Sequence, residues 1–152
     1  MNDPVREWEL VPFERVGPVR LGASREEVAS VLGRPDREVG PAQFFGAEGP
    51  VRVTYDGAGQ VLAVEVGPER PVELRGRRLT RSELDDARRQ LGELGIATEM
   101  DESGGGVVAP EAGIALRTSS PGSAAPPGTV QSISGFRPDY YTVRDAGPAE
   151  EG

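Results

Sequence analysis

The sequence contains no cysteine and no histidine. The first absence excludes disulfide bonds, thiolate metal sites and a cysteine nucleophile. The second removes the imidazole that commonly ligates zinc and serves as a general base near neutral pH. Serine–histidine–aspartate and cysteine–histidine catalytic arrangements are therefore excluded by inventory. We expect a protein that is not an enzyme and that uses neither a metal nor a cofactor.

Lysine is also missing, so all 17 basic residues are arginine, and they stand against 25 acidic residues for a formal net charge of -8. Affinity for nucleic acid comes largely from cations that displace counterions from the phosphate backbone, which an acidic chain supplies poorly. We therefore expect no nucleic-acid partner. A basic protein is the better electrostatic match.

Long apolar runs are absent, and aromatic residues make up only 5% of the chain. No stretch approaches the roughly 20 apolar residues that span a bilayer. The first ten residues include Asp3, Glu7 and Glu9 and do not resemble a secretory or lipoprotein signal. We expect a cytoplasmic protein that does not contact a membrane.

The length of 152 residues predicts a single domain, and the 21 glycines and 14 prolines predict many turns and a modest core. We place this domain at residues 1–144, with a first half at 14–67 and a second half at 71–143. Residues 145–152 show no periodicity, and we expect them to form a disordered tail.

The division into halves follows from a weak internal repeat, in which the same helix-start signal recurs after 56 residues. Ser24 with Glu27, and Thr80 with Glu83, have the spacing of a capping box, in which the hydroxyl and the carboxylate each accept a hydrogen bond from a backbone amide. Glycines end both predicted helices. Between each capping signal and its glycine, apolar residues recur at helical spacing: Val28, Val31 and Leu32 before Gly33, and Leu84, Ala87, Leu91 and Leu94 before Gly95.

Strand signals follow each predicted helix. Alternating residues at 51–55 and 61–66 flank a turn at 56–59, which predicts a β-hairpin. The second half repeats this pattern less regularly, with a Ser-, Ala-, Pro- and Gly-rich stretch that predicts a long loop. Its predicted strands are 106–109, 114–117 and 129–134, the loop is 119–128, and two further short strands are predicted at 43–45 and 72–74.

The resulting fold class is α+β: one antiparallel sheet with two helices on one face, built from two related helix-hairpin halves. The opposite face of the sheet would then be free to bind a partner.

One region resembles a known family. Residues 17–28 read GPVRLGASREEV, residues 32–35 read LGRP, and a hairpin with Tyr55 follows. This pattern is similar to the outer-membrane assembly lipoproteins of the SmpA/OmlA type, whose helix-then-sheet repeat the β-lactamase inhibitory proteins share. The chain lacks the lipobox cysteine of the former and the disulfides of the latter, so the resemblance implies architecture and not activity.

The overall layout, including the ending GFRPDYY at residues 135–141, is also similar to actinobacterial immunity partners of polymorphic toxins. Such a resemblance implies a cofactor-free cytoplasmic protein that blocks a toxin.

Several charged clusters and one glycine run have plain alternatives to a functional role. Two acidic clusters are typical of either solvated charge or a cation site: Asp85 with Asp86, and Glu99 with Asp101 and Glu102. Adjacent residues on a helix point in different directions, which disfavours a shared cation at Asp85 and Asp86. Arginines between Arg75 and Arg81 either bind an anion or offset neighbouring carboxylates. The run at 104–106 is interpreted as a turn, because no lysine follows it as in a phosphate-binding loop.

Two kinds of side chain are the predicted partner contacts. Rigid aromatic residues contribute strongly to interfaces when exposed, and acidic side chains complement a basic partner. The predicted contact residues are Trp8, Tyr140 and Tyr141 among the aromatics, and Asp56, Glu65 and Asp139 among the acids.

The leading hypothesis is a non-catalytic protein-binding module, specifically an immunity or inhibitor protein that neutralises a toxin by occlusion. The alternative is a structural or regulatory module that forms a homodimer through an exposed sheet edge. A hydrolase that uses carboxylates alone is the third hypothesis, and it requires two acidic residues facing each other in a pocket.

Overall fold

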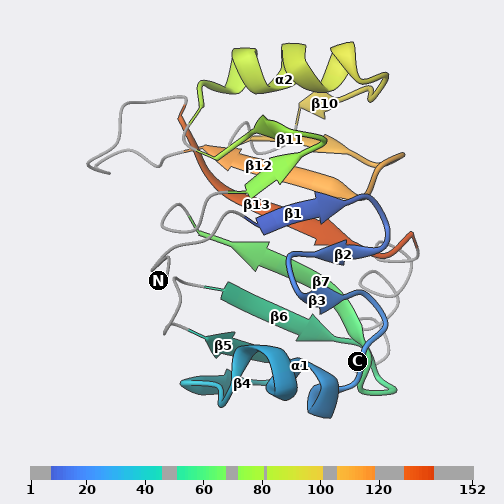
Figure 1. The fold of residues 1–152 in the computed structure, drawn as a ribbon, viewed down its shortest axis with the longest axis vertical. Coiled ribbons are helices and arrows are strands. Elements are labelled where there is room, and N and C mark those ends of the chain that lie inside the picture. The colour runs from blue at the N-terminus through green and yellow to red at the C-terminus, as the bar shows by residue number, and fades with distance from the viewer. Residues whose placement is uncertain are drawn as a thin grey trace, which may run out of the picture.

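The computed structural model describes residues 8–45, 51–67, 72–80, 82–100, 106–118 and 129–138. Of these residues, 50% lie in strands and 17% in helices, arranged as two sheets and two helices. The expected α+β fold, with one sheet and two helices on one face, is therefore wrong. Figure 1 shows the two helices at opposite ends of the molecule, with a second sheet between them.

The larger sheet has eight strands, all antiparallel to their neighbours, in the order β10-β11-β12-β13-β7-β6-β5-β4. Two four-stranded meanders meet at its centre, where β7 pairs with β13 from Val66 opposite Ile133 to Ala63 opposite Phe136. The two halves of the chain thus share one continuous sheet. Its strands are β4 (Arg37–Val39), β5 (Ala42–Phe45), β6 (Val51–Tyr55), β7 (Val61–Val66), β10 (Glu99–Met100), β11 (Gly106–Ala109), β12 (Ile114–Thr118) and β13 (Val130–Phe136).

The smaller sheet has five strands in the order β3-β2-β1-β8-β9 and packs against the larger one. Its central pair, β1 and β8, is parallel, with Trp8 opposite Val72. This pairing joins a strand that precedes the first half to the start of the second half. The strands are β1 (Trp8–Val11), β2 (Arg15–Val16), β3 (Val19–Arg20), β8 (Val72–Leu74) and β9 (Arg77–Arg78).

The first helix, α1 (Arg25–Leu32), begins as predicted. The Ser24 hydroxyl accepts a hydrogen bond from the Glu27 amide at 3.2 Å, and the Glu27 carboxylate accepts one from the Ser24 amide at 2.8 Å. Val28 is the buried residue of this helix, and Gly33 follows as its C-cap. The first capping box is therefore confirmed.

Replacing Ser24 with alanine is expected to lower the free energy of unfolding by about 1 kcal/mol, because the Glu27 amide loses its acceptor. Urea denaturation followed by circular dichroism measures this change. Ser30→Ala is the matched control, since Ser30 is exposed and its hydroxyl donates to a carbonyl already within the helix. An equal loss in both variants would contradict the role of the cap.

The second helix, α2 (Leu84–Glu93), begins differently. Its N-cap is Glu83, which makes no side-chain capping bond, while the Thr80 hydroxyl is buried and accepts from the Val72 amide of β8 at 2.9 Å. The predicted second capping box is thus wrong, because Thr80 serves the smaller sheet.

The end of α2 matches the prediction. Gly95 has φ +83, its amide donates to Gly92, and the Ile96 amide donates to Leu91. These two bonds form a Schellman cap, for which glycine is favoured.

The two halves correspond element by element. In each half the residue that precedes the helix forms an isolated antiparallel bridge with the residue that precedes the last strand of the meander. Ser24 bridges Gln60, and Glu83 bridges Thr129. Each half is therefore a helix followed by four antiparallel strands, which is one strand more after each helix than the sequence predicts.

The core lies between the larger sheet and the layer formed by the smaller sheet and the helices. Its fully buried large side chains include Leu10, Leu74, Leu79, Leu91 and Ile114. Within the described ranges, neither helix has the length or apolar run needed to cross a membrane.

Candidate functional site

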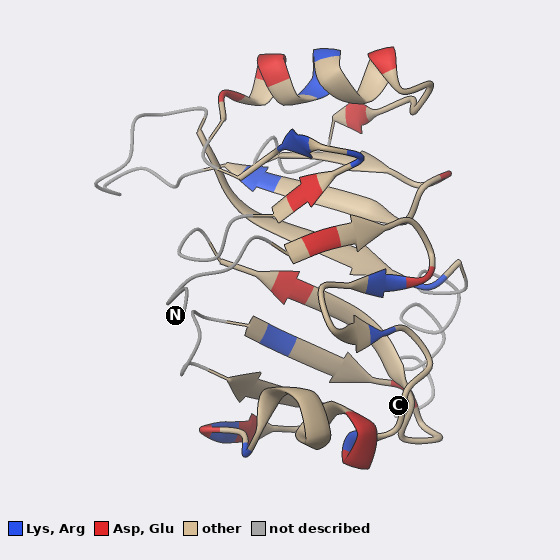
Figure 2. Ribbon diagram, in the orientation of Figure 1, with Lys and Arg blue, Asp and Glu red and all other residues tan. Residues whose placement is uncertain are grey.

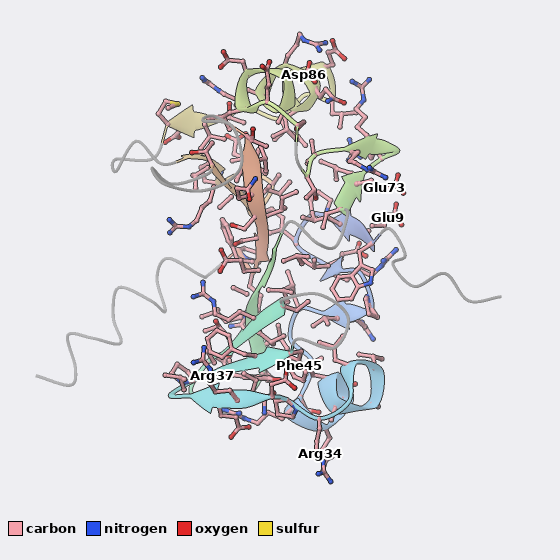
Figure 3. All side chains as sticks on the ribbon, turned by 90° about the vertical axis from the view of Figure 1, so that its left-hand side faces the viewer. Glu9, Arg34, Arg37, Phe45, Glu73 and Asp86 are labelled. Atoms are coloured by element: carbon pink, nitrogen blue, oxygen red, sulfur yellow. The ribbon has the colours of Figure 1, made fainter. Side chains whose placement is uncertain are left out.

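The most accessible continuous surface built by the larger sheet is its outer face. Figure 3 shows the smaller sheet and the helices on one side of the larger sheet, and no described helix or strand on the other side. Strand register places one side chain from each of the eight strands in a single line across this face. We call this line the outer row: Arg37, Phe44, Arg52, Glu65, Ser134, Ala115, Val108 and Glu99.

The adjacent line of residues points the other way and is apolar. Phe45, Val51, Val66, Ile133, Leu116 and Val107 lie opposite one another in register, and each is at most 5% exposed. Because successive strand residues alternate between faces, this buried line fixes the outer row on the accessible side. The outer row is therefore a consequence of core packing.

Small side chains occupy the middle of the outer face. Ser134 and Ala115 are half-buried in the outer row, and Ser132 lies beside them in register with Arg117 of β12. The face is not open along its whole length, because Phe136, in register with Ala63, is buried although it lies outside the main core cluster. The accessible part is thus centred on the outer row itself.

Glu65, a predicted contact residue, lies at the centre of the outer row. Its carboxylate pairs with Arg52 at 2.6 Å and accepts a hydrogen bond from the Ser132 hydroxyl at 2.9 Å. The Glu65 side chain is 21% exposed. Its charge is thus largely neutralised within the face.

Phe44 on β5 and Arg37 on β4 are the last two residues at one end of the outer row. The guanidinium carbon of Arg37 lies 4.5 Å from the centroid of the Phe44 ring, a cation–π contact. Neither residue is among the contacts predicted from the sequence. The signal was available in the alternation of residues 42–45, whose even positions face outward, but four residues are too few to fix a face without the neighbouring strand.

Asp56, the second acidic contact predicted from the sequence, has a structural role in the β6–β7 turn. Its carboxylate accepts hydrogen bonds from the amides of Ala58 and Gln60 at 2.9 and 3.0 Å and pairs with Arg137 at 2.7 Å. Burial alone would raise the pKa of Asp56, but these two amides and the Arg137 guanidinium together lower it. The carboxylate is therefore committed to the turn.

Trp8 was expected to be partly exposed, and this expectation is wrong. The side chain is 8% exposed and belongs to the core cluster. Gly17 lies directly against the ring, so that a Cβ atom there would be 2.3 Å from it. The other three predicted contacts, Asp139, Tyr140 and Tyr141, lie outside the described residues.

The arginine cluster of the second half is partly occupied by ion pairs. Arg77 pairs with Glu93 of α2, and Arg75 occupies the β8–β9 turn with φ +52. Arg77 is thus offset by a carboxylate of α2 and not by one that neighbours it in the sequence. Arg81 lies outside the described residues.

The acidic clusters show no metal-site geometry where they are described. Asp86 pairs with Arg89, which also contacts Glu93 at 3.2 Å, while Asp101 and Glu102 lie outside the described part of the chain. Among the described residues, no group of three or more acidic side chains could hold a metal ion.

One buried polar network fastens α1 to the larger sheet. The Tyr55 hydroxyl donates to the Gln43 side-chain oxygen at 2.6 Å, the Gln43 amide group donates to Glu38, and Arg25 covers the Tyr55 ring at 4.3 Å. Burial raises the pKa of the Tyr55 hydroxyl, an effect that Arg25 opposes and Glu38 reinforces. Because each of these groups has a partner, the network is structural.

Charge is nearly balanced over the described surface, and Figure 2 shows acidic and basic positions interspersed on both sheets and along α2. Much of the acidic surplus belongs to sequence outside the described residues. Residues 1–7, 101–105 and 139–152 contain eight acidic residues but only two arginines, Arg6 and Arg144. The described residues therefore carry only a small part of the net charge of -8.

Comparison with protein-family models, curated proteins and solved structures finds no match to this chain. The resemblances to the SmpA/OmlA-type lipoproteins, the β-lactamase inhibitory proteins and the immunity proteins therefore stay predictions.

Proposed function

We propose that this protein is a non-catalytic binding module that occludes a partner protein with the outer face of its eight-stranded sheet, as an immunity or inhibitor protein does. The observation that supports the proposal is the outer row, a line of accessible and half-buried side chains that crosses every strand. A partner on this row would contact both halves of the chain at once.

The dimensions of the face suit a protein partner. The eight strands together contain 36 residues, and each residue covers about 3.3 Å along its strand and about 4.8 Å across to the next strand, which gives roughly 570 Å² of sheet. A stable interface buries about 800 Å² on each partner. The outer face therefore supplies most of a standard interface, and loops beside it would supply the rest.

The composition of the outer row also fits a docking surface. Arginine and aromatic residues are enriched at interface centres, and the outer row contains Arg37, Phe44 and Arg52 on three adjacent strands. The small residues Ser134 and Ala115 allow another backbone to approach the sheet closely. We expect this half of the outer row to contribute most to affinity.

Replacing Ser134 with tryptophan is expected to reduce recovery of a protein partner at least tenfold, because the new ring would stand in the middle of the outer face. The assay is a quantitative pulldown with the tagged full chain from its native host, followed by mass spectrometry. Glu73→Trp is the matched control, since Glu73 is also half-buried but lies on the smaller sheet.

Two results would contradict the proposal. One is a pulldown that recovers no protein with the unmodified chain. The other is a partner that Ser134→Trp retains and Glu73→Trp loses.

The homodimer alternative is favoured by one observation, the exposure of the edge strand β4. All three residues of β4 are exposed, and Val39 is 54% exposed. Such an edge offers unpaired backbone groups to a second copy, although its short length limits the pairing. Light scattering of the purified chain separates the alternatives, since a dimer that Val39→Glu dissociates would favour the edge-to-edge module.

A further inference from the structure

The charges of the outer face are unevenly paired. Arg52 is neutralised by Glu65. Arg37 and Arg117 are both exposed, and in the described part of the chain neither guanidinium has a carboxylate partner. Glu99 lies on the edge strand β10, beyond Arg117, and so outside the interval between the two arginines. That interval therefore carries two uncompensated positive charges.

The two arginines are far enough apart to act as separate contacts. Arg37 lies on β4 and Arg117 on β12, five strand intervals apart, which corresponds to about 24 Å. At physiological ionic strength the screening length is about 8 Å, so each arginine responds to charges in its own neighbourhood.

Each arginine is placed to receive a carboxylate. The Arg37 guanidinium is held over the Phe44 ring, a stacked arrangement that restricts its motion, and its N–H groups have no carboxylate partner among the described residues. Arg117 stands beside Ser132 in register, so no large side chain from β13 covers it. A guanidinium binds a carboxylate through two parallel hydrogen bonds, which gives both strength and geometry.

We infer that the outer face docks a protein surface that presents carboxylates at two points about 24 Å apart, one at Arg37 on Phe44 and one at Arg117. This inference rests on the proposed function and adds the chemistry of the partner. The acidic partner surface inferred from the two arginines differs from the basic partner that the net charge predicts. The net charge is a property of the whole chain, whereas the two arginines belong to the docking face.

The experiment places a photo-crosslinking amino acid, p-benzoylphenylalanine, at Ala115, which lies in the outer row with Arg37 and two residues from Arg117 on β12. The full chain is expressed in its native host in three forms: otherwise unmodified, with Arg37→Glu and Arg117→Glu, and with Arg20→Glu and Arg34→Glu. Arg20 and Arg34 are exposed arginines outside the larger sheet, so the third form has the same net charge as the second. Circular dichroism confirms that all three forms are folded.

The expected result is a crosslinked protein in the unmodified and control forms and at least a tenfold lower yield in the Arg37→Glu, Arg117→Glu form. Arg37→Lys with Arg117→Lys keeps the charges and should retain a substantial part of the yield. The crosslinked peptide should contain aspartate or glutamate.

An unchanged or increased yield after charge reversal would overturn the inference and leave the proposed function intact, and an increase would indicate a basic partner. The absence of any crosslinked protein in all three forms would overturn both.

Discussion

Gly135→Val is expected to lower the free energy of unfolding by about 3 kcal/mol, because Gly135 of the larger sheet lies directly against side chains of the smaller sheet. A Cβ atom at this position would lie 2.5 Å from Cγ2 of Val16 in β2 and 3.7 Å from Cδ1 of Leu10 in β1. Valine is favoured in strands, so a loss of stability would come from the packing of the smaller sheet on the larger one. Urea denaturation gives the change.

Two further variants test this explanation. Ser134→Val introduces the same side chain at the adjacent residue, which points to the accessible face, and should change the stability by less than about 1 kcal/mol. Val16→Ala removes the methyl groups that the new valine would meet, so its combination with Gly135→Val should be more stable than the sum of the single effects predicts. Strictly additive effects would show that the two residues do not contact each other.

The local elements of the first half could be predicted because their signals are short-range. The cap at Ser24, the helix that follows it and the hairpin with a turn at Asp56 are confirmed. The strands at 43–45 and 72–74 also appear, with boundaries that differ by at most one residue. Each signal depends on residues that are neighbours in the sequence.

The smaller sheet could not be predicted, and its omission explains the wrong fold class. Strands β2, β3 and β9 have two residues each, which is too short for alternation to appear. The parallel pairing of β1 with β8 joins Trp8 to Val72 across most of the first half. Because this pairing buries Trp8 between the sheets, the same omission explains why Trp8 was expected on the surface.

The candidate site was predicted only in part, for a related reason. Chemical type alone identifies single residues and not the face on which they lie. Of the described acidic candidates, Glu65 lies on the outer face and Asp56 stabilises a turn. The position of Arg37 and Phe44 on the outer face follows only from the register of neighbouring strands. Register between distant strands follows from how the core packs, which the local pattern does not specify.

Asp56→Ala is expected to lower the free energy of unfolding by about 3 kcal/mol. The substitution removes the acceptor for two backbone amides, at about 1 kcal/mol each, and leaves the positive charge of Arg137 without this carboxylate. The Arg137 side chain is only 18% exposed, so water replaces the lost partner incompletely. Asp56→Asn keeps an acceptor for the turn and should cost less, while Glu93→Ala, which breaks exposed ion pairs, should cost the least of the three.

The effect of Asp56 should depend on pH in a definite direction. Because the pKa of Asp56 is lower in the folded chain than its ordinary value of 3.8, the ionised carboxylate stabilises the fold at pH values above 3.8. That contribution is lost as the pH falls through the folded-state pKa, where the carboxylate takes up a proton. Urea denaturation of the unmodified chain and of Asp56→Asn should therefore give a constant difference between pH 5 and 8 and a smaller one below pH 3.8. A difference that stays the same down to pH 2.5 would mean that the charge of Asp56 does not stabilise the hairpin and that its role is confined to the turn hydrogen bonds.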